Sequence, residues 1–351
     1  MIGHLAYATG SPCPTVVLDA RRLSADEETL RRELTEMRRY LTEAGGSHVL
    51  KIALVRPSAH PLFDLDYRFV QALPDGPDRF DFRGSCGHSI LSAVVSAERA
   101  GILPALTAGG RVRVNVLNNG DSVVCEMEET GLNEVRFTVY FVQPVGVPLP
   151  ELLLTGEPRT ELEADGVLRT VSLVSTGNPY VFVDARDLGI RDHTELFAAG
   201  DALFEQMARL RVAAAGRLGW SPDGAFPKIA ATLPEASGRI AARAISVPSW
   251  HPTIALTGAV CLGAATRIPG TVPWRIAQEA GRTDGPLGIT TPGGRTTVTA
   301  ATHDIGGQPA LTWVGVGRKH VTHQGSFVLE PLAHLQFEEI AQCLALSAAS
   351  V

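Results

Sequence analysis

Gly84-Ser-Cys-Gly-His-Ser89, with the apolar run from Ile90 to Ala100 and the stop at Gly101, is the most informative segment of this chain for its fold. Leu256-Thr257-Gly258 opens a second run of the same kind, which ends at Pro269-Gly270. Each run begins with small residues and is apolar on all its faces. A helix that is apolar all round is buried, so each of these two helices is expected inside a wrapped sheet.

Segments with strand patterns surround both helices in a similar order. Strands are predicted at 48–56, 66–71, 111–117, 122–129, 134–142, 168–175, 180–183, 228–233, 240–247 and through much of 288–328. Two longer helices are predicted outside them, at 25–43 and 195–218. The first should begin with Ser24 as its N-cap and Glu27 three residues later, as in a capping box.

This order predicts an α+β fold with two pseudo-symmetric halves, residues 1–150 and 151–351, joined by a proline-rich linker from Pro144 to Pro150. Two such halves facing each other place both helix starts at one interface. Backbone N–H groups and the helix dipole attract anions there. A cleft between the halves is therefore the predicted site for a substrate with carboxylates.

Composition narrows the class of protein. The 351 residues predict about two domains, and 45% hydrophobic against 19% charged residues predicts a chain with a large core. The net charge of −6 argues against a nucleic-acid partner, because phosphate binding needs clustered cations. Of the 31 basic residues only three are lysines, Lys51, Lys228 and Lys319, so each lysine invites an explanation.

The five cysteines are widely spaced and form no CxxC pair, which predicts neither a disulfide framework nor structural zinc and indicates a reducing compartment. The first residues lack the pattern of a signal peptide. The longest uncharged run, Pro252 to Thr266, is too short to cross a membrane. We expect a cytoplasmic monomer or homodimer with no membrane partner.

Cys86 and Lys51 are the first candidates for chemistry. Cys86 lies in a glycine-flanked turn at a helix start, which lowers a thiol pKa from about 8.5; the alternative is an inert buried cysteine. Lys51 lies in an aliphatic strand, where alternation favours a solvent-facing side chain over a buried one with a lowered pKa. Cys125, Cys261 and Cys343 are expected in the core, and Cys13 is undecided.

Motifs for metals and organic cofactors are missing from the sequence. There is no GxxxxGK[ST] phosphate loop, no HExxH, no complete dinucleotide fingerprint and no GxSxG elbow. His320 and His323 have a spacing seen at metal sites, but on a strand their side chains point to opposite faces. No cofactor and no metal are therefore expected.

Several segments resemble the PrpF family: Ser85-Cys-Gly87, Gly177-Asn-Pro-Tyr-Val-Phe-Val183, Pro227-Lys-Ile-Ala230, Thr257-Gly-Ala-Val-Cys261 and Arg267-Ile-Pro-Gly-Thr-Val272. This is the family of 2-methylaconitate cis–trans isomerase, methylitaconate Δ-isomerase and oxalomesaconate tautomerase. The resemblance implies the diaminopimelate epimerase fold, in which each of two pseudo-symmetric halves wraps a sheet round a central helix. It extends in order from about residue 45 to residue 275.

The resemblance also implies functional residues. The family's Ser-Lys-Val-Ala-Ile-Val strand matches Leu50-Lys51-Ile-Ala-Leu-Val55, and its Cys-Gly-Asn turn matches Cys86-Gly87-His88. Lys51 and Cys86 are then the implied acid/base pair. The implied substrate-binding residues are Gly87, His88, Ser89, Gly177, Asn178, His251, Thr257 and Gly258.

Three departures from the family bear on the substrate, and one of them is His88, which stands where the family has Asn after Cys-Gly. The amino-terminal Arg-Gly-Gly-Thr-Ser-Lys-Gly is replaced by Ala8-Thr-Gly-Ser-Pro-Cys-Pro14, and Arg-Thr-Ala-Arg near the end by Gly317-Arg-Lys-His320. The lost cations favour a less acidic, larger or cyclic substrate. Similar isomerases occur in actinobacterial antibiotic pathways, including those that make 4-alkylproline units, and the arginine-rich composition agrees with that setting.

The predicted function is a cofactor-independent isomerase that moves a carbon–carbon double bond in an unsaturated carboxylate. A base removes an allylic or vinylogous proton, and an acid returns one at the far carbon. One alternative is an epimerase on the same fold, which a cysteine at each helix start would favour. The other is a non-catalytic small-molecule binding protein, which the loss of the amino-terminal motif favours.

Overall fold

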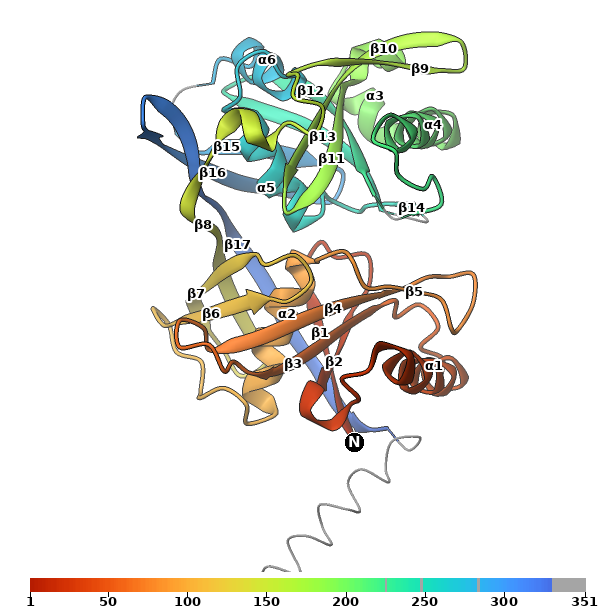
Figure 1. Cartoon of the computed structure of the whole chain (residues 1–351), viewed down its shortest axis with the longest axis vertical. Coiled ribbons are helices and arrows are strands. Elements are labelled where there is room, and N and C mark those ends of the chain that lie inside the picture. The colour runs from red at the N-terminus through yellow and green to blue at the C-terminus, as the bar shows by residue number, and fades with distance from the viewer. Residues whose placement is uncertain (225, 247–248, 283–284, 330–351) are drawn as a thin grey trace, which may run out of the picture.

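Two α+β halves lie end to end in the computed structural model (Figure 1), which describes residues 1–224, 226–246, 249–282 and 285–329. Two long strands, β8 (Glu134–Pro148) and β17 (Gln308–Val328), run between the halves and pair with each other. The 17 strands of the described residues form one hydrogen-bonded sheet. A strand ladder therefore joins the two halves.

The first half wraps its sheet around α2 (Gly87–Arg99), of which the first eleven residues are buried. In its sheet β2 runs parallel to β3, β3 antiparallel to β4, and β4 parallel to β6. The strands of this half are β1 (Ile2–Ala8), β2 (Thr15–Asp19), β3 (Lys51–Pro57), β4 (Leu65–Ala72), β5 (Phe80–Asp81), β6 (Arg111–Val116) and β7 (Ser122–Thr130). Helix α1 (Glu27–Glu43) packs on the outer face of the sheet.

The second half repeats this order around α5 (Leu256–Ala265), which is buried at every residue. Here β11 runs parallel to β12, β12 antiparallel to β13, and β13 parallel to β15. The strands are β9 (Thr160–Ala164), β10 (Val167–Thr176), β11 (Asn178–Asp184), β12 (Lys228–Glu235), β13 (Arg239–Ser246), β14 (Ser249–Trp250), β15 (Leu287–Thr291) and β16 (Gly294–Ile305). The predicted pair of pseudo-symmetric halves is confirmed.

The described residues form three further α-helices: α3 (His193–Ala198), α4 (Asp201–Arg217) and α6 (Val272–Glu279). Helix α6 packs in the main core with α5, and α3 and α4 pack in a separate core. Three short 3₁₀ helices are described at Ala20–Arg22, Leu149–Leu152 and Ala185–Leu188. Helix α4 covers the outer face of the second sheet, as α1 covers the first. None of the helices in the described ranges is long and apolar enough to cross a membrane.

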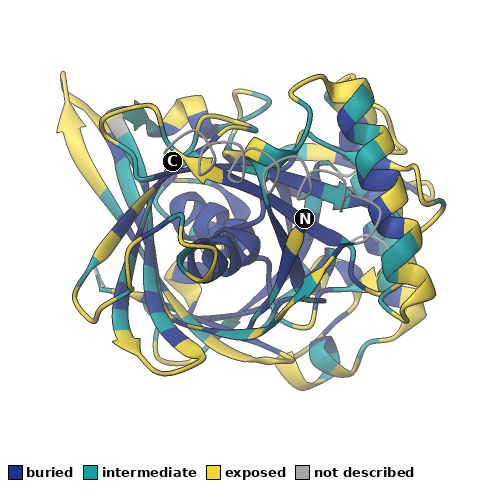
Figure 2. Ribbon diagram, turned by 90° about the horizontal axis from the view of Figure 1, so that it is seen from below, coloured by how far each residue is buried: buried dark blue, intermediate teal, exposed yellow. Residues whose placement is uncertain are grey.

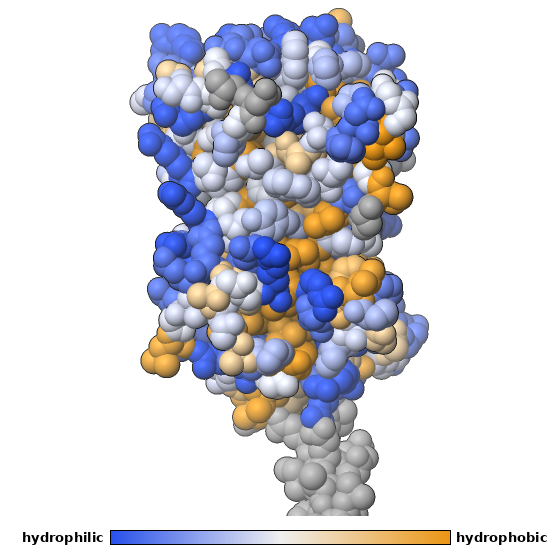
Figure 3. All heavy atoms as spheres, turned by 90° about the vertical axis from the view of Figure 1, so that its left-hand side faces the viewer, coloured by the Kyte–Doolittle hydropathy of each residue, from blue (hydrophilic) through white to orange (hydrophobic). Residues whose placement is uncertain are grey.

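One apolar core extends through both halves. It contains α2, with Ile90, and α5, with Val260, together with inward-facing sheet residues from each half. Figure 2 shows the buried helical centre inside the ring of strands. Smaller cores lie under α1 and α4. The surface in Figure 3 is mostly hydrophilic, with a smaller apolar area over the lower half.

Three local predictions are wrong. The segment from Pro144 to Pro150 is not a linker, because β8 continues to Pro148 and pairs with β17. The N-cap of α1 is Asp26, whose carboxylate accepts from Thr29 N; Ser24 Oγ accepts from Asp26 N one step earlier. The helix expected at 195–218 is broken where Ala199 adopts extended backbone angles, so two helices replace it.

Candidate active site

The starts of α2 and α5 meet between the two halves. A Cβ on Gly87 would lie only 2.6 Å from Leu256 Cδ2, so a glycine permits this approach. Asn178 joins the two starts: its Nδ2 donates to Ser85 O at 2.8 Å and to Thr257 Oγ1 at 3.1 Å. The predicted interface of two helix N-termini is therefore present, and one buried amide side chain spans it.

The side-chain charges of all three lysines of the chain are felt at this interface. Lys51 is the first residue of β3 and Lys228 the first residue of β12, and these two strands are equivalent in the two halves. Lys319 comes from β17, the strand that both halves share. The charges of all three contribute to lowering the pKa of two imidazoles at the interface, those of His88 and His251. The site is thus surrounded by cations.

Cys86 is the N-cap residue of α2 and is only 8% exposed. Burial alone opposes ionisation of its thiol and raises the pKa. The Lys51 ammonium, a hydrogen bond from Ser89 and the Lys228 ammonium act the other way, and the pKa of the thiol ends below its ordinary value. The surroundings of Cys86 thus make its thiol easier to ionise than an ordinary cysteine.

Lys51 is buried, with 5% of its surface exposed, so the solvent-facing position that alternation favoured is wrong. Its Nζ donates to Ser11 Oγ at 2.8 Å, and Ser11 Oγ donates in turn to Cys13 O at 2.8 Å. The β1–β2 loop therefore holds the amine in place.

Cys13, which the sequence left undecided, is buried in that same loop beside Lys51 and Cys86. Burial raises the pKa of its thiol, against a smaller opposing effect of the Lys51 charge. The pKa shifts of the two thiols are therefore opposite: that of Cys13 is raised and that of Cys86 is lowered. Cys125 and Cys261 are core residues as predicted, and Cys343 lies outside the described residues.

His88 and His251 stack on each other across the interface. Their ring centroids are 5.9 Å apart and the ring planes are inclined by 22°. Burial, aided by the nearby lysine charges, holds the pKa of both imidazoles well below the ordinary range. Both rings are therefore neutral at physiological pH. His251 Nδ1 accepts from Thr253 N at 3.1 Å, which places its proton on Nε2.

The other predicted substrate-binding residues lie in two different places, the buried interface and a separate contact between the halves. Ser89 Oγ lies 2.9 Å from Thr15 Oγ1 in the buried interface, and Gly258 lets Tyr180 Oη approach α5, since a Cβ there would lie 2.5 Å from that oxygen. Gly177, with φ +97°, is exposed and lies against the Asp121 carboxylate at a separate contact between the halves. Asn178 therefore belongs to the buried interface, and Gly177, which precedes it, does not.

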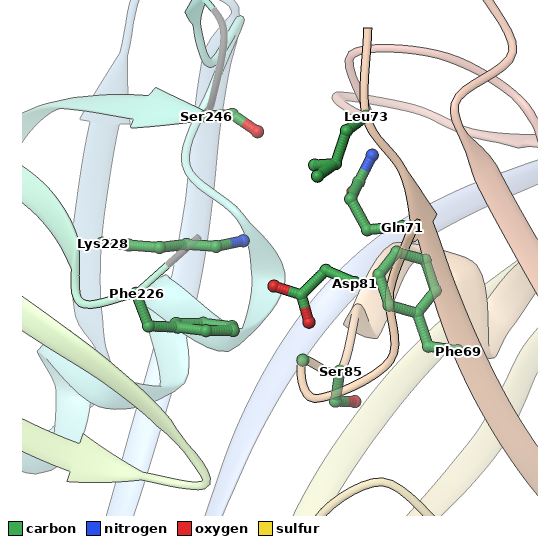
Figure 4. Close-up of a pocket in the computed structure, with 9 residues that line it drawn as sticks. Phe69, Gln71, Leu73, Asp81, Ser85, Phe226, Lys228 and Ser246 are labelled. Carbon is green, nitrogen blue, oxygen red and sulfur yellow. The ribbon is translucent and has the colours of Figure 1, made fainter. Parts of the chain in front are cut away.

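A pocket opens next to this cluster, with walls from both halves (Figure 4). Its empty volume is about 430 Å³ when the open solvent at its mouth is included. Its lining residues are Phe69, Gln71, Leu73, Asp81, Gly84, Ser85, Phe226, Lys228 and Ser246. Lys228 and Asp81 point toward each other across it in Figure 4. The pocket thus borders the start of α2 through Gly84 and Ser85, the two residues before Cys86.

Sequence reasoning did not select Lys228, Lys319, Ser11 or Cys13 as site residues. One signal was available: Lys-Ile-Ala occurs at 51–53 and again at 228–230, at equivalent strand starts. Lysine is also rare in this chain, and every copy is at the site. Across the described ranges, no group of three or more His, Cys, Asp or Glu residues is arranged to hold a metal ion.

Comparison with known proteins gives a family match and named relatives. The model described as "PrpF protein" matches residues 39–313. The chain is 27% identical to 4-oxalomesaconate tautomerase of Pseudomonas putida over 74% of this chain and 77% of that protein. It is 26% identical to 3-methylitaconate isomerase of Eubacterium barkeri over 67% and 72% of the two chains.

Solved structures share the fold. Methylitaconate-delta-isomerase superposes with a TM-score of 0.64 at 20% identity, covering 95% of this chain and 97% of that one. A hydroxyproline epimerase from Agrobacterium vitis gives a TM-score of 0.61 at 15% identity, covering 93% and 91%. The predicted epimerase-like α+β fold is therefore confirmed.

Proposed function

Because the chain belongs to the PrpF protein family, we propose that it is an isomerase that moves a carbon–carbon double bond in an unsaturated carboxylate by transferring a proton. Its relatives are named as isomerases and tautomerases. The observation that carries the proposal is the buried Cys86 thiol at the start of α2, whose pKa is lowered by Lys51, Ser89 and Lys228 against the effect of burial. A thiolate at that place is a suitable carbon base.

In the proposed mechanism Cys86 is the base and Lys51 the acid. The Cys86 thiolate takes a proton from the carbon next to the double bond, and the electron pair spreads over the conjugated carboxylate as a dienolate. The Lys51 ammonium then gives a proton to the far carbon. Transfer of a proton from the new thiol to the neutral amine restores both groups. Helix-start amides and the remaining cations stabilise the dienolate.

The cations favour a substrate with more than one carboxylate. The amino-terminal arginine and lysine of the family are missing here, but Lys228 and Lys319 bring charge to the same interface from other strands. This argues against the less acidic substrate that the sequence favoured. An intermediate of 4-alkylproline formation stays a finer prediction, which the names of the relatives do not support.

Deuterium exchange tests the proposed reaction. Methylitaconate, 2-methylaconitate and oxalomesaconate are incubated with the protein in heavy water and followed by NMR. Exchange coupled to migration of the double bond supports an isomerase. Exchange with inversion at a single carbon indicates an epimerase, and the absence of exchange with all three contradicts the proposal.

The variant Cys86→Ala tests the role of the thiol. We expect a loss of turnover of about 10²-fold or more, with a change in stability near 1 kcal/mol because little buried volume is removed. Cys125→Ala is the control, since that thiol lies in the core. Wild-type turnover in Cys86→Ala would exclude Cys86 as the base.

A further inference from the structure

His88 is a buried polar side chain that the proposed proton transfer does not use. It is the second residue of α2 and is only 1% exposed. Both of its ring nitrogens lack a hydrogen-bond partner among the described residues. Buried imidazoles in folded proteins are nearly always paired, because an unpaired buried group costs about 1–3 kcal/mol. The unpaired nitrogens therefore need a ligand-based or structural explanation.

The surroundings of His88 favour a ligand. Lys319, Lys51 and Lys228 act on it electrostatically, and His251 stacks on it. Among these cations the ring is neutral, so it offers one N–H donor and one lone pair. The lysine ammonium groups are suited to pair with the carboxylates of a ligand. The neutral imidazole is the group in this cluster suited to an uncharged oxygen.

We propose that His88 determines specificity by hydrogen-bonding a hydroxyl or enol oxygen of the substrate, so that the substrate class is an unsaturated polycarboxylate with such an oxygen rather than an alkyl group at that position. This inference depends on the proposed function in one respect only, namely that the ligand carries carboxylates. A hydroxyl group accepts from the imidazole N–H or donates to its lone pair. A methyl group would leave both nitrogens unpaired, and a site built for hydrogen bonding rejects such an analogue.

A matched pair of unreactive ligands tests this without relying on turnover. Malate and methylsuccinate are both dicarboxylates and differ by a hydroxyl in place of a methyl group. Titration calorimetry at pH 7.5 measures both dissociation constants for the wild-type protein. We expect malate to bind about 10-fold more tightly or better, as expected when the analogue leaves a buried polar group unpaired.

Two variants of His88 and one control locate the effect. His88→Leu should abolish the preference for malate, and His88→Asn should keep part of it because an amide also donates and accepts. His48→Leu, at an exposed position, should bind like the wild type. His88→Leu should also raise the melting temperature, because it removes unpaired buried groups; a structural histidine would lower it when replaced.

The outcomes separate this inference from the proposed function. Equal binding of the two ligands by the wild type, binding of neither at 10 mM, or an unchanged preference in His88→Leu would overturn the role of His88. Deuterium exchange into the unsaturated substrates would stand in any of these cases. A preference for malate without any exchange would support the role of His88 and contradict the isomerase.

Discussion

Lys51 is a buried amine that one hydroxyl group holds, with its Nζ 2.8 Å from Ser11 Oγ. This setting makes the choice between lysine and arginine a test of proton donation. An arginine stays charged at any working pH and does not give up a proton. If Lys51 is the acid, charge alone at this position is not sufficient for turnover.

We expect Lys51→Arg and Lys51→Ala to lose kcat by similar amounts, about 10²-fold or more. Lys51→Arg should keep more of the substrate affinity, because its charge still attracts carboxylates. Steady-state kinetics and a direct measurement of ligand binding check both points. Substantial turnover in Lys51→Arg would instead identify Lys51 as a fixed charge.

Lys319 shows how a buried cation in this site lowers the stability of the folded state. Burial lowers the pKa of Lys319 from 10.5 to about 8. Between these pH values the unfolded chain binds a proton that the folded chain does not, so this group makes stability rise with pH across that range. Below about pH 8 both states are protonated, and the folded state bears the full cost of the buried charge.

Lys319→Met should therefore stabilise the protein at pH 7, by up to about 3 kcal/mol. The gain should shrink above pH 8 and be mostly lost by pH 10.5, where the folded amine is neutral and the unfolded amine is half protonated. Urea unfolding at pH 7, 9 and 10.5 measures it, with Arg318→Met at the neighbouring exposed position as the control. A gain that is the same at all three pH values would contradict the assignment.

At the scale of elements, the close approach of α2 and α5 positions the site. Their first residues, Gly87 and Leu256, would collide if Gly87 had a Cβ. Gly87→Ala should destabilise the protein by about 1–3 kcal/mol, as overpacking does. Turnover should fall as well, because Cys86 precedes this contact directly.

The matched control is Gly216 in α4, where a Cβ would meet nothing within 4 Å. Gly216→Ala should leave stability unchanged or raise it by up to about 1 kcal/mol, since alanine favours a helix. Urea unfolding and turnover of both variants are compared. Similar behaviour of the two would mean that the contact between the helix starts is not critical.

At the scale of the whole molecule, β8 and β17 pair with each other, and one core contains both central helices. The first strand of the chain, β1, also pairs with β17, so the end of the described chain completes the first half. The two halves are therefore expected to unfold together. The division at residue 150 stays a prediction. It separates two halves with a similar order of elements, and it does not imply that each half folds on its own.

Fluorescence offers a direct measurement of this cooperativity. All four tryptophans lie after residue 150, at Trp220, Trp250, Trp274 and Trp313. Tryptophan emission therefore reports on the second half and β17, and far-ultraviolet circular dichroism reports on both halves. Coincident urea transitions are expected. Separate midpoints would show that the halves unfold independently.

Local sequence patterns predict the two buried helices, most of the strands and the position of Cys86 at a helix start. These features depend on local patterns: apolar residues on all faces of a helix, alternation in strands, and small residues before a helix start. The same patterns carried the resemblance to the family. These patterns do not predict the break before α4. They do not predict the continuation of β8 either, because a neighbouring strand in space decides whether a proline-rich segment stays extended.

Which side chains face the site depends on tertiary packing, and the sequence does not predict it. Alternation placed Lys51 in solvent, but both faces of β3 are covered: Ala53 packs in the core around α2, and Ile52 packs under α1. A strand buried on both faces has no solvent side. The pairing of distant strands likewise brings Lys228 close to Cys86 and Lys319 close to His88. No local pattern encodes this proximity, because it depends on how the two halves and β17 register against each other.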